Sequence, residues 1–162
     1  MDRKVVIIPT YNEKENIEAI VRKVFSLEGE YNVLIIDDGS PDGTAAIVKK
    51  VQTDFPERLF LLERSGKLGL GTASLTGFKW ALENGYDYIF EMDADFSHNP
   101  EDLPRLYKAC AECGGVAIGS RYCDGISVVN CPSGRSLMAY FASDYVKTVL
   151  GMKITDCTAG VK

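Results

Sequence analysis

The sequence lacks any apolar run that approaches the roughly 18 residues needed for a membrane-spanning helix. It also lacks an excess of positive charge, since 18 lysines and arginines stand against 23 aspartates and glutamates, giving a net charge of −5. Because a phosphate backbone requires a basic face, this balance argues against nucleic acid as the main partner. No secretory leader precedes the first apolar run, so we expect a cytoplasmic protein.

Cysteine and histidine are also scarce. Five cysteines include one C-x-x-C pair, Cys110 and Cys113, but no second pair of similar spacing that would complete a zinc site. The odd count without a leader favours five reduced thiols, with zinc or redox chemistry at this pair as the alternative. His98 is the only histidine, and no serine or cysteine nucleophile pattern accompanies it. We therefore expect it to be a local loop partner rather than a catalyst.

The chain does have a regular alternation of apolar runs and amphipathic segments, and its length fits a single domain over residues 1–162. The apolar runs predict strands at residues 5–8, 33–36, 59–62, 86–92 and 116–118. Amphipathic segments predict helices over 17–25, 41–51, 72–82 and 137–149, with another helix after Asn99. Ser40 and Asn99 each precede a proline, a pattern typical of helix N-caps. Buried strands separated by helices indicate an α/β fold: a mostly parallel sheet with helices on both faces.

Polar or glycine-rich segments follow every predicted strand. They are residues 9–13 (PTYNE), 37–40 (DDGS), 64–71 (RSGKLGLG), 93–95 (DAD) and 119–121 (GSR). In open α/β sheets, ligands bind outside the carboxyl ends of the strands. We therefore expect all five segments to gather at one edge of the sheet and to form the binding site there.

Asp93 and Asp95 point to a metal. Two positions apart in an extended segment, they share a face with Cα atoms roughly 6.5–7 Å apart. Carboxylates placed in this way repel one another unless a cation lies between them. Mg²⁺ and Mn²⁺ prefer oxygen ligands and often combine one or two carboxylates with substrate phosphates. The alternative is a pair of solvated aspartates in a turn.

The other two motifs allow more than one interpretation. Asp37 and Asp38 could accept hydrogen bonds from a base or ribose, whereas a calcium loop is excluded because its twelfth position is Lys49 rather than glutamate. Gly69 and Gly71 suggest a dinucleotide fold and a nicotinamide-dependent oxidoreductase, but the third glycine of that fingerprint is missing.

Taken together, the motifs resemble a known family. They are residues 9–13 (PTYNE), 37–44 (DDGSPDGT), 67–71 (KLGLG), 92–98 (MDADFSH) and 119–122 (GSRY). In this order they resemble dolichol-phosphate mannosyltransferases and their bacterial polyprenyl-phosphate relatives, inverting family 2 glycosyltransferases with the Rossmann-like glycosyltransferase-A fold. The resemblance extends to Gly160, and the chain ends at Lys162 where relatives continue, so we expect it to lack their C-terminal part.

The resemblance implies the substrates and the roles of individual residues. The donor would be GDP-mannose or a similar nucleotide sugar, and the acceptor a polyprenyl phosphate at the cytoplasmic face of a membrane, with Mg²⁺ or Mn²⁺ as cofactor. The residues expected at the nucleotide are Pro9, Tyr11, Glu13, Asp37, Asp38, Lys67 and Ala94; those at the metal are Asp93, Asp95 and Ser97; and those at the acceptor phosphate and donor diphosphate are Arg121 and Arg135, with Asp156 as a further active-site acid.

This chemistry needs no strong base, because a phosphate monoester is largely dianionic at pH 7. Two alternatives stay open. A sugar hydroxyl could be the acceptor, with Asp156 as its base, or the chain could bind nucleotide sugars without catalysis.

Overall fold

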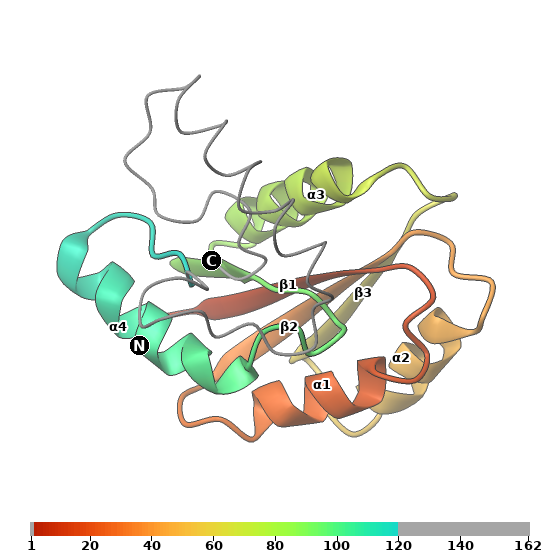
Figure 1. Ribbon diagram of the computed structural model, residues 1–162, viewed down its shortest axis with the longest axis horizontal. Helices are drawn as coiled ribbons and strands as arrows, with labels where there is room; N and C mark the ends of the chain where they lie inside the picture. Colours follow the sequence, from red (N-terminus) through yellow and green to blue (C-terminus); the bar gives the residue numbers. More distant parts are fainter. Residues whose placement is uncertain (1, 120–162) are drawn as a thin grey trace, which may run out of the picture.

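Four parallel strands form the sheet in the computed structural model of the protein, which describes residues 2–119 (Figure 1). The strand order is β3-β2-β1-β4, so the first strand of the chain lies inside the sheet between β2 and β4. The strands are β1 (Lys4–Thr10), β2 (Tyr31–Asp37), β3 (Leu59–Glu63) and β4 (Tyr88–Glu91). The helices are α1 (Ile17–Phe25), α2 (Thr44–Gln52), α3 (Leu70–Glu83), the 3-10 turn η1 (Pro100–Asp102) and α4 (Leu103–Cys113).

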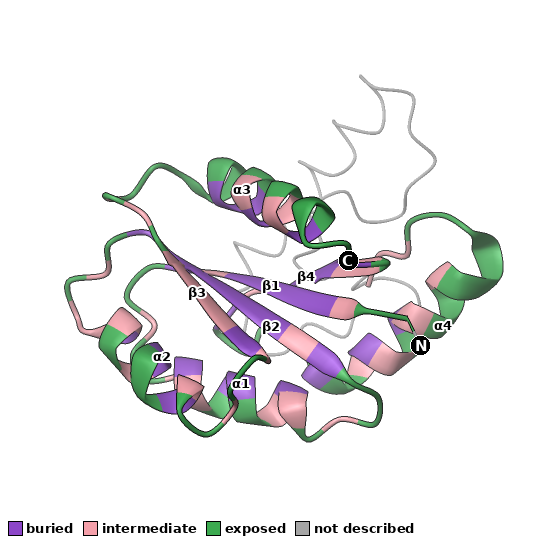
Figure 2. Ribbon diagram, turned by 180° about the vertical axis from the view of Figure 1, so that it is seen from behind, coloured by how far each residue is buried: buried purple, intermediate pink, exposed green. Residues whose placement is uncertain are grey.

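Both faces of the sheet are covered, as the sequence predicts. Alternate strand residues such as Ile7 and Ile36 pack with α3, while their neighbours such as Ile8 and Ile35 pack with α1, α2 and α4. Figure 1 shows α3 alone on one face and the other helices on the opposite face. The central strands are therefore largely buried, which Figure 2 shows as purple along most of β1 and β2. This double burial explains why their sequences are apolar without alternation.

Helix α3 lies unusually close to the sheet at Gly77. A Cβ atom on this glycine would lie 2.6 Å from Cγ2 of Ile7 and 2.8 Å from Cδ1 of Ile36. Glycine at this position thus lets the helix backbone rest directly on β1 and β2. The first turn of the same helix lies beside the carboxyl ends of β1 and β2.

One predicted strand and the predicted start of one helix are wrong. Residues 116–118 form no strand in the described part of the chain, and Val116 is 78% exposed. A run of three apolar residues after two glycines has neither the length nor the burial that defines a strand. Helix α2 begins at Thr44 rather than at Pro41, because Gly43 adopts a left-handed φ of 91° and the Asp42 carboxylate accepts the Thr44 amide.

The second predicted cap is confirmed. The Asn99 side chain accepts the Glu101 amide at 3.1 Å, and η1 leads directly into α4. The helix predicted over 137–149 lies outside the described residues. In the part of the chain that the structure describes, no helix has the length and apolar character required to cross a membrane.

Candidate functional site

The carboxyl ends of all four strands meet at one edge, because the strands are parallel and in the same sheet. The four polar segments that follow them therefore gather there, as the sequence predicts. The fifth segment begins at Gly119, the last described residue, so its place at this edge stays a prediction.

The loop after β1 is held by side chains from the loop after β2. Three successive backbone amides of the first loop donate to three side-chain oxygens of the second. These bonds run from Asn12 to Ser40 Oγ (2.9 Å), from Glu13 to Thr44 Oγ1 (3.0 Å) and from Lys14 to Asp42 Oδ2 (3.1 Å). The Glu13 carboxylate in turn accepts the Asn16 side-chain amide at 3.0 Å. Residues 37–44 (DDGSPDGT) therefore act as a scaffold that fixes the conformation of residues 9–13 (PTYNE).

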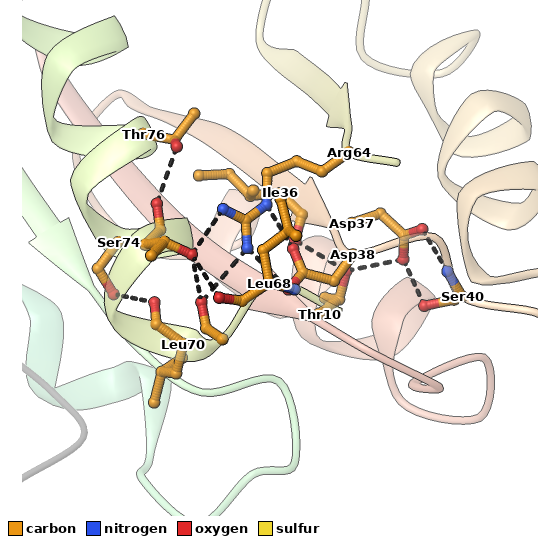
Figure 3. A network of polar contacts seen from close by, with 12 residues as sticks. Thr10, Ile36, Asp37, Asp38, Ser40, Arg64, Leu68, Leu70, Ser74 and Thr76 are labelled. Carbon is orange, nitrogen blue, oxygen red and sulfur yellow. Dashed lines mark hydrogen bonds and ion pairs between the residues drawn. The ribbon is translucent and has the colours of Figure 1, made fainter. Parts of the chain in front are cut away.

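Asp37 is part of this scaffold. Its side chain is buried and accepts the Thr10 hydroxyl at 3.1 Å, the Ser40 amide at 2.9 Å and the Ser40 hydroxyl at 2.6 Å (Figure 3). Both carboxylate oxygens are therefore engaged in joining the ends of β1 and β2. Nucleotide binding by Asp37 stays a prediction, and the contacts of its side chain in the structure are with Thr10 and Ser40.

Asp38 faces the loop after β3, where Arg64 binds both oxygens of its carboxylate. Arg64 Nε lies 2.6 Å from Asp38 Oδ1, and Nη2 lies 2.7 Å from Oδ2. The Leu68 amide adds a third hydrogen bond to Oδ2 at 3.2 Å. These bonds, chiefly those from Arg64, hold the pKa of the Asp38 carboxyl below its usual value. Figure 3 shows that this pair bridges the loops after β2 and β3.

Arg64 is a site residue that the sequence motifs did not assign. It also donates to the Thr72 hydroxyl at 2.9 Å, so it joins Asp38 to the first turn of α3. An arginine directly after β3 is a usable signal once the order β3-β2-β1 is known, because it must then face the acids that end β2. Arg64 and Asp38 are 26 residues apart, so the sequence alone does not indicate that they form a pair.

A pocket of about 120 Å³ opens between these loops. Its lining residues are Pro9, Thr10, Tyr11, Asp38, Lys67, Gly69, Leu70 and Ala73. Four of the residues predicted to bind the nucleotide, Pro9, Tyr11, Asp38 and Lys67, are therefore brought together. The Lys67 ammonium lies 4.4 Å from the centre of the Tyr11 ring. The pocket thus combines an aromatic face, a positive charge and a carboxylate.

The DAD segment continues directly from β4. The Met92 amide still donates to the Ile7 carbonyl at 3.1 Å, and Met92 and Ala94 are buried in the core with α1 and α4. The intervening Asp93 side chain is 40% exposed, and Asp95 is also exposed. Alternation thus presents both carboxylates on the side away from that core. Any contact of Ala94 with a ligand would come from its backbone.

Local bonds order this segment. The Ser97 amide donates to Asp95 Oδ1 at 2.9 Å. Partial burial acts to raise the pKa of the Asp95 carboxyl, but the hydrogen bonds from Ser97 outweigh it and hold this pKa below its ordinary value. The ring of His98 lies within 3.2 Å of the Ser97 hydroxyl and 4.0 Å of the Asp93 carboxylate. His98 is therefore the local partner that the sequence predicts.

The donor set at this segment fits a hard divalent cation. Asp93 and Asp95 offer carboxylate oxygens, Ser97 offers a hydroxyl, and an ionised Asp95 is favoured by its lowered pKa. Within residues 2–119, no group of three or more histidine, cysteine or acidic side chains could hold a metal by itself. Two carboxylates suit Mg²⁺ or Mn²⁺ when substrate phosphates complete the coordination.

Several predicted residues lie outside the described part of the chain. They are Arg121, Arg135 and Asp156, together with three of the five cysteines. Cys110 and Cys113 are free thiols at the end of α4, and their Sγ atoms lie near the Gly115 carbonyl at 2.8 Å and the Cys110 carbonyl at 3.8 Å respectively.

Comparison with known proteins identifies close relatives. The chain is 45% identical over 160 residues to polyprenol monophosphomannose synthase from Mycolicibacterium smegmatis and 42% identical to undecaprenyl-phosphate mannosyltransferase from Micrococcus luteus. Each match covers 99% of this chain but only 60% and 65% of the respective relative. A dolichol-phosphate mannosyltransferase from Pyrococcus furiosus is 38% identical over 136 residues, which are 83% of this chain and 37% of that protein.

Solved structures show the same fold. A mannosyltransferase from Pyrobaculum calidifontis in complex with GDP-Man and Mn²⁺ matches with a TM-score of 0.58 and 28% identity, over 67% of this chain and 32% of that chain. A glucosyl-3-phosphoglycerate synthase from Mycobacterium tuberculosis matches with a TM-score of 0.63 at 16% identity, over 99% and 55% of the two chains, and supports the fold alone. The glycosyltransferase-A-like architecture predicted from the sequence is confirmed.

The family model agrees with the sequence motifs and with the fold. Residues 5–161 match the Glycosyl transferase family 2, which covers nearly the whole chain. The nicotinamide-dependent alternative has no such support. The chain belongs to glycosyl transferase family 2.

Proposed function

We propose that this chain is the donor-binding and catalytic part of an enzyme that transfers mannose from GDP-mannose to a polyprenyl phosphate, with inversion and with Mg²⁺ or Mn²⁺. The observation that carries the proposal is the juxtaposition of the Tyr11–Asp38–Lys67 pocket and the Asp93–Asp95 carboxylates at one sheet edge. Its chemistry matches a ligand with a base, a ribose and a diphosphate. The names of the 45% and 42% identical relatives support a polyprenyl phosphate acceptor and mannose.

The pocket residues would hold the nucleoside. The Asp38 carboxylate can accept N–H groups of a base or hydroxyls of a ribose, and Arg64 keeps it charged and oriented for that purpose. Tyr11 presents an aromatic face, and Lys67 beside it can meet the negative charge of a phosphate. Glu13 and Asp37 would act indirectly, through the shape of the loops after β1 and β2.

Asp93, Asp95 and Ser97 would hold the divalent cation. When bound, this ion would neutralise the charge that develops on the leaving diphosphate. The presence of GDP-Man and Mn²⁺ together in the related Pyrobaculum complex supports this assignment. The protein's own part would be to hold the two aspartates facing the diphosphate, and Ser97 would assist through its bond to Asp95.

The reaction would be a single in-line displacement. A phosphate oxygen of the acceptor attacks the anomeric carbon, the bond from that carbon to the diphosphate breaks, and the configuration inverts. A phosphate monoester is already largely dianionic near pH 7, so no strong general base is required. Arg121 and Arg135 would position it through charge-assisted hydrogen bonds, with Asp156 nearby. A lipid acceptor would place the reaction at the cytoplasmic surface of a membrane.

Two measurements test the proposal. Calorimetry with a panel of nucleotide sugars, with and without Mn²⁺, should select GDP-mannose and require the metal. Transfer assays in detergent should then compare polyprenyl phosphate with a free oligosaccharide, using a longer version of the protein if the 162-residue chain is inactive. Arg135→Ala should lose acceptor use more than donor binding.

Other outcomes would contradict it. Transfer to the oligosaccharide alone would indicate a hydroxyl acceptor, with Asp156 as the candidate base. Metal-dependent binding of GDP-mannose without turnover in any version of the protein would indicate a binding domain.

A further inference from the structure

A buried carboxylate precedes the DAD segment. Glu91 is the last residue of β4, and only 6% of it is exposed. A carboxylate in such a place destabilises a fold unless hydrogen bonds or charges compensate for its lost hydration. An apolar residue, as at the other inward positions of the sheet, would fill the space without that cost. Packing alone therefore does not explain why a glutamate occupies this position.

Glu91 contacts the helix on the nucleotide side of the site. It pairs with Ile7 in the sheet and so lies on the face that α3 covers. The hydroxyl of Ser74 in α3 donates to Glu91 Oε1. This hydroxyl also lies 3.1 Å from the Leu70 carbonyl, in the first turn of the helix (Figure 3). Ser74 thus connects the start of α3 with the end of β4.

This contact joins the two halves of the site. The nucleotide half is the pocket that α3 helps to line, and the metal half is the pair Asp93 and Asp95 after β4. Leu70 and Ala73, which precede Ser74 in the same helix, line the nucleotide pocket. Asp93 follows Glu91 by two positions, within roughly 7 Å along an extended strand. A nucleoside diphosphate must span from the pocket to the metal carboxylates. The distance between α3 and β4 therefore determines whether one ligand can occupy both halves at once.

We infer that Glu91 is a positioning residue that, through Ser74, sets the separation between the nucleotide pocket and the metal-binding aspartates. The inference rests on the proposed function, since it requires a metal-bound nucleotide. Without the contact, both halves remain intact but no longer match the length of one ligand. Misplacement by about 1 Å is enough to cost on the order of 10²-fold in a preorganised site.

The experiment measures how strongly Mn²⁺ enhances GDP binding. Calorimetry on the 162-residue chain gives the GDP dissociation constant with and without Mn²⁺, and their ratio is the enhancement. The variants are Ser74→Ala, Glu91→Ala and Glu91→Gln, the last of which still offers an oxygen to Ser74. Thr76→Ala is the matched control, because its hydroxyl donates to the Thr72 carbonyl of the same helix. Thermal unfolding without ligand measures stability separately.

We expect Ser74→Ala and Glu91→Ala to lower the enhancement about tenfold, within the usual range of coupling between two sites. GDP binding without metal should stay near that of the parent, and Glu91→Gln and Thr76→Ala should keep the full enhancement. A general loss of stability would instead weaken both GDP measurements equally.

Two results would overturn the inference. A full enhancement in both Ser74→Ala and Glu91→Ala would refute it while leaving the proposed function intact, and Ser74→Ala decides alone if Glu91→Ala does not fold. Absence of any Mn²⁺ enhancement in the parent chain would instead contradict the proposed metal-dependent function, and the inference with it.

Discussion

The loops after β1, β2 and β3 and the loop after β4 use their acidic residues in different ways. Asp37 and Asp38 are both buried: Asp37 accepts bonds from Thr10 at the end of β1 and from Ser40, and Asp38 accepts bonds from Arg64 and Leu68 after β3. Asp93 and Asp95 face solvent to a much larger extent, with bonds from within their own segment such as that from Ser97. The first pair joins neighbouring loops, with Asp38 also lining the pocket, whereas the side chains of the second pair face outward.

This difference separates stability from activity. Contacts in the nucleotide half join loops from three strands, so their loss should lower the free energy of unfolding as well as binding. The carboxylates of the metal half face outward and repel one another without a cation, so their loss should spare the fold. Substitutions in the nucleotide half should therefore lower the free energy of unfolding, whereas those in the metal half should lower activity and leave the fold stable.

The largest effect is expected in the metal half. Asp95→Ala should lower turnover on the order of 10²-fold or more, comparable to the loss of a preorganised charge stabiliser. Unfolding in denaturant should change little, because the side chain is exposed. Transfer assays and urea titration of the same samples check both points. If Asp95→Ala binds metal and donor like the parent chain, the metal site lies elsewhere.

Removal of Arg64 should produce the largest loss of stability. Arg64→Met leaves the buried Asp38 carboxylate without its main partner, which should cost about 3 kcal/mol of unfolding free energy. Arg22→Met is the control, since Arg22 forms ion pairs with Glu18 and Asp54 but is exposed, and it should change stability little. Equal losses of unfolding free energy in the two variants would mean that burial does not determine how much the Arg64–Asp38 pair stabilises the fold.

The same pair predicts a pH dependence. The folded-state pKa of Asp38 is lowered, so its stabilisation is present above the unfolded pKa of about 3.9 and is lost as pH falls through the folded pKa. The stability difference between the parent and Arg64→Met should therefore be largest near neutral pH and narrow below about pH 4. Urea titrations between these pH values test it. A difference that widens in acid would contradict the assigned direction.

A smaller loss is expected where α3 rests on the sheet. Gly77→Ala should destabilise by about 1–2 kcal/mol, because overpacking against Ile7 and Ile36 exceeds the gain in helix propensity. Gly71→Ala in the same helix is the control, since its Cβ would meet nothing within 4 Å. We expect that variant to be neutral or slightly more stable in thermal unfolding. Stabilisation by both would show that α3 can move away from the sheet.

The smallest effect concerns the scaffold between the loops after β1 and β2. Ser40→Ala removes an acceptor for the Asn12 amide and a donor to Asp37, which should cost about 1 kcal/mol. Ser26→Ala, which removes an exposed hydroxyl bonded to the Lys23 carbonyl, should cost less. Comparable urea midpoints for the two variants would indicate that the scaffold is supported by its other contacts.

The sheet and the edge where the polar segments gather could be predicted from the sequence, because both depend on local patterns. Four apolar runs became β1 to β4, and the polar segments after them had to meet where parallel strands end. The end of α2 was also predicted within one residue, but its start was not. There the carboxylate of Asp42 and the left-handed Gly43 determine where the helix begins.

Long-range pairing accounts for what the sequence could not reveal. Arg64 and Asp38 are 26 residues apart, and Ser74 and Glu91 are 17 residues apart. Glu91 was included in an apolar strand, and nothing local distinguishes it from a glutamate at an exposed strand end. The division of labour between Asp37 and Asp38 likewise depends on which loops become neighbours.

The central place of β1 has a consequence for synthesis on the ribosome. Of the four strands this one is synthesised before the others, yet it pairs with β2 on one edge and with β4 on the other. Its partner on the β2 side follows after one helix, but β4 emerges only after β2, β3, α2 and α3. The growing chain therefore displays one apolar, unpaired strand edge until β4 is synthesised, and such edges favour association with other chains. Early docking of α3 would cover a face of β1 but not that edge, so a nascent chain paused before Tyr88 is the form most exposed to aggregation.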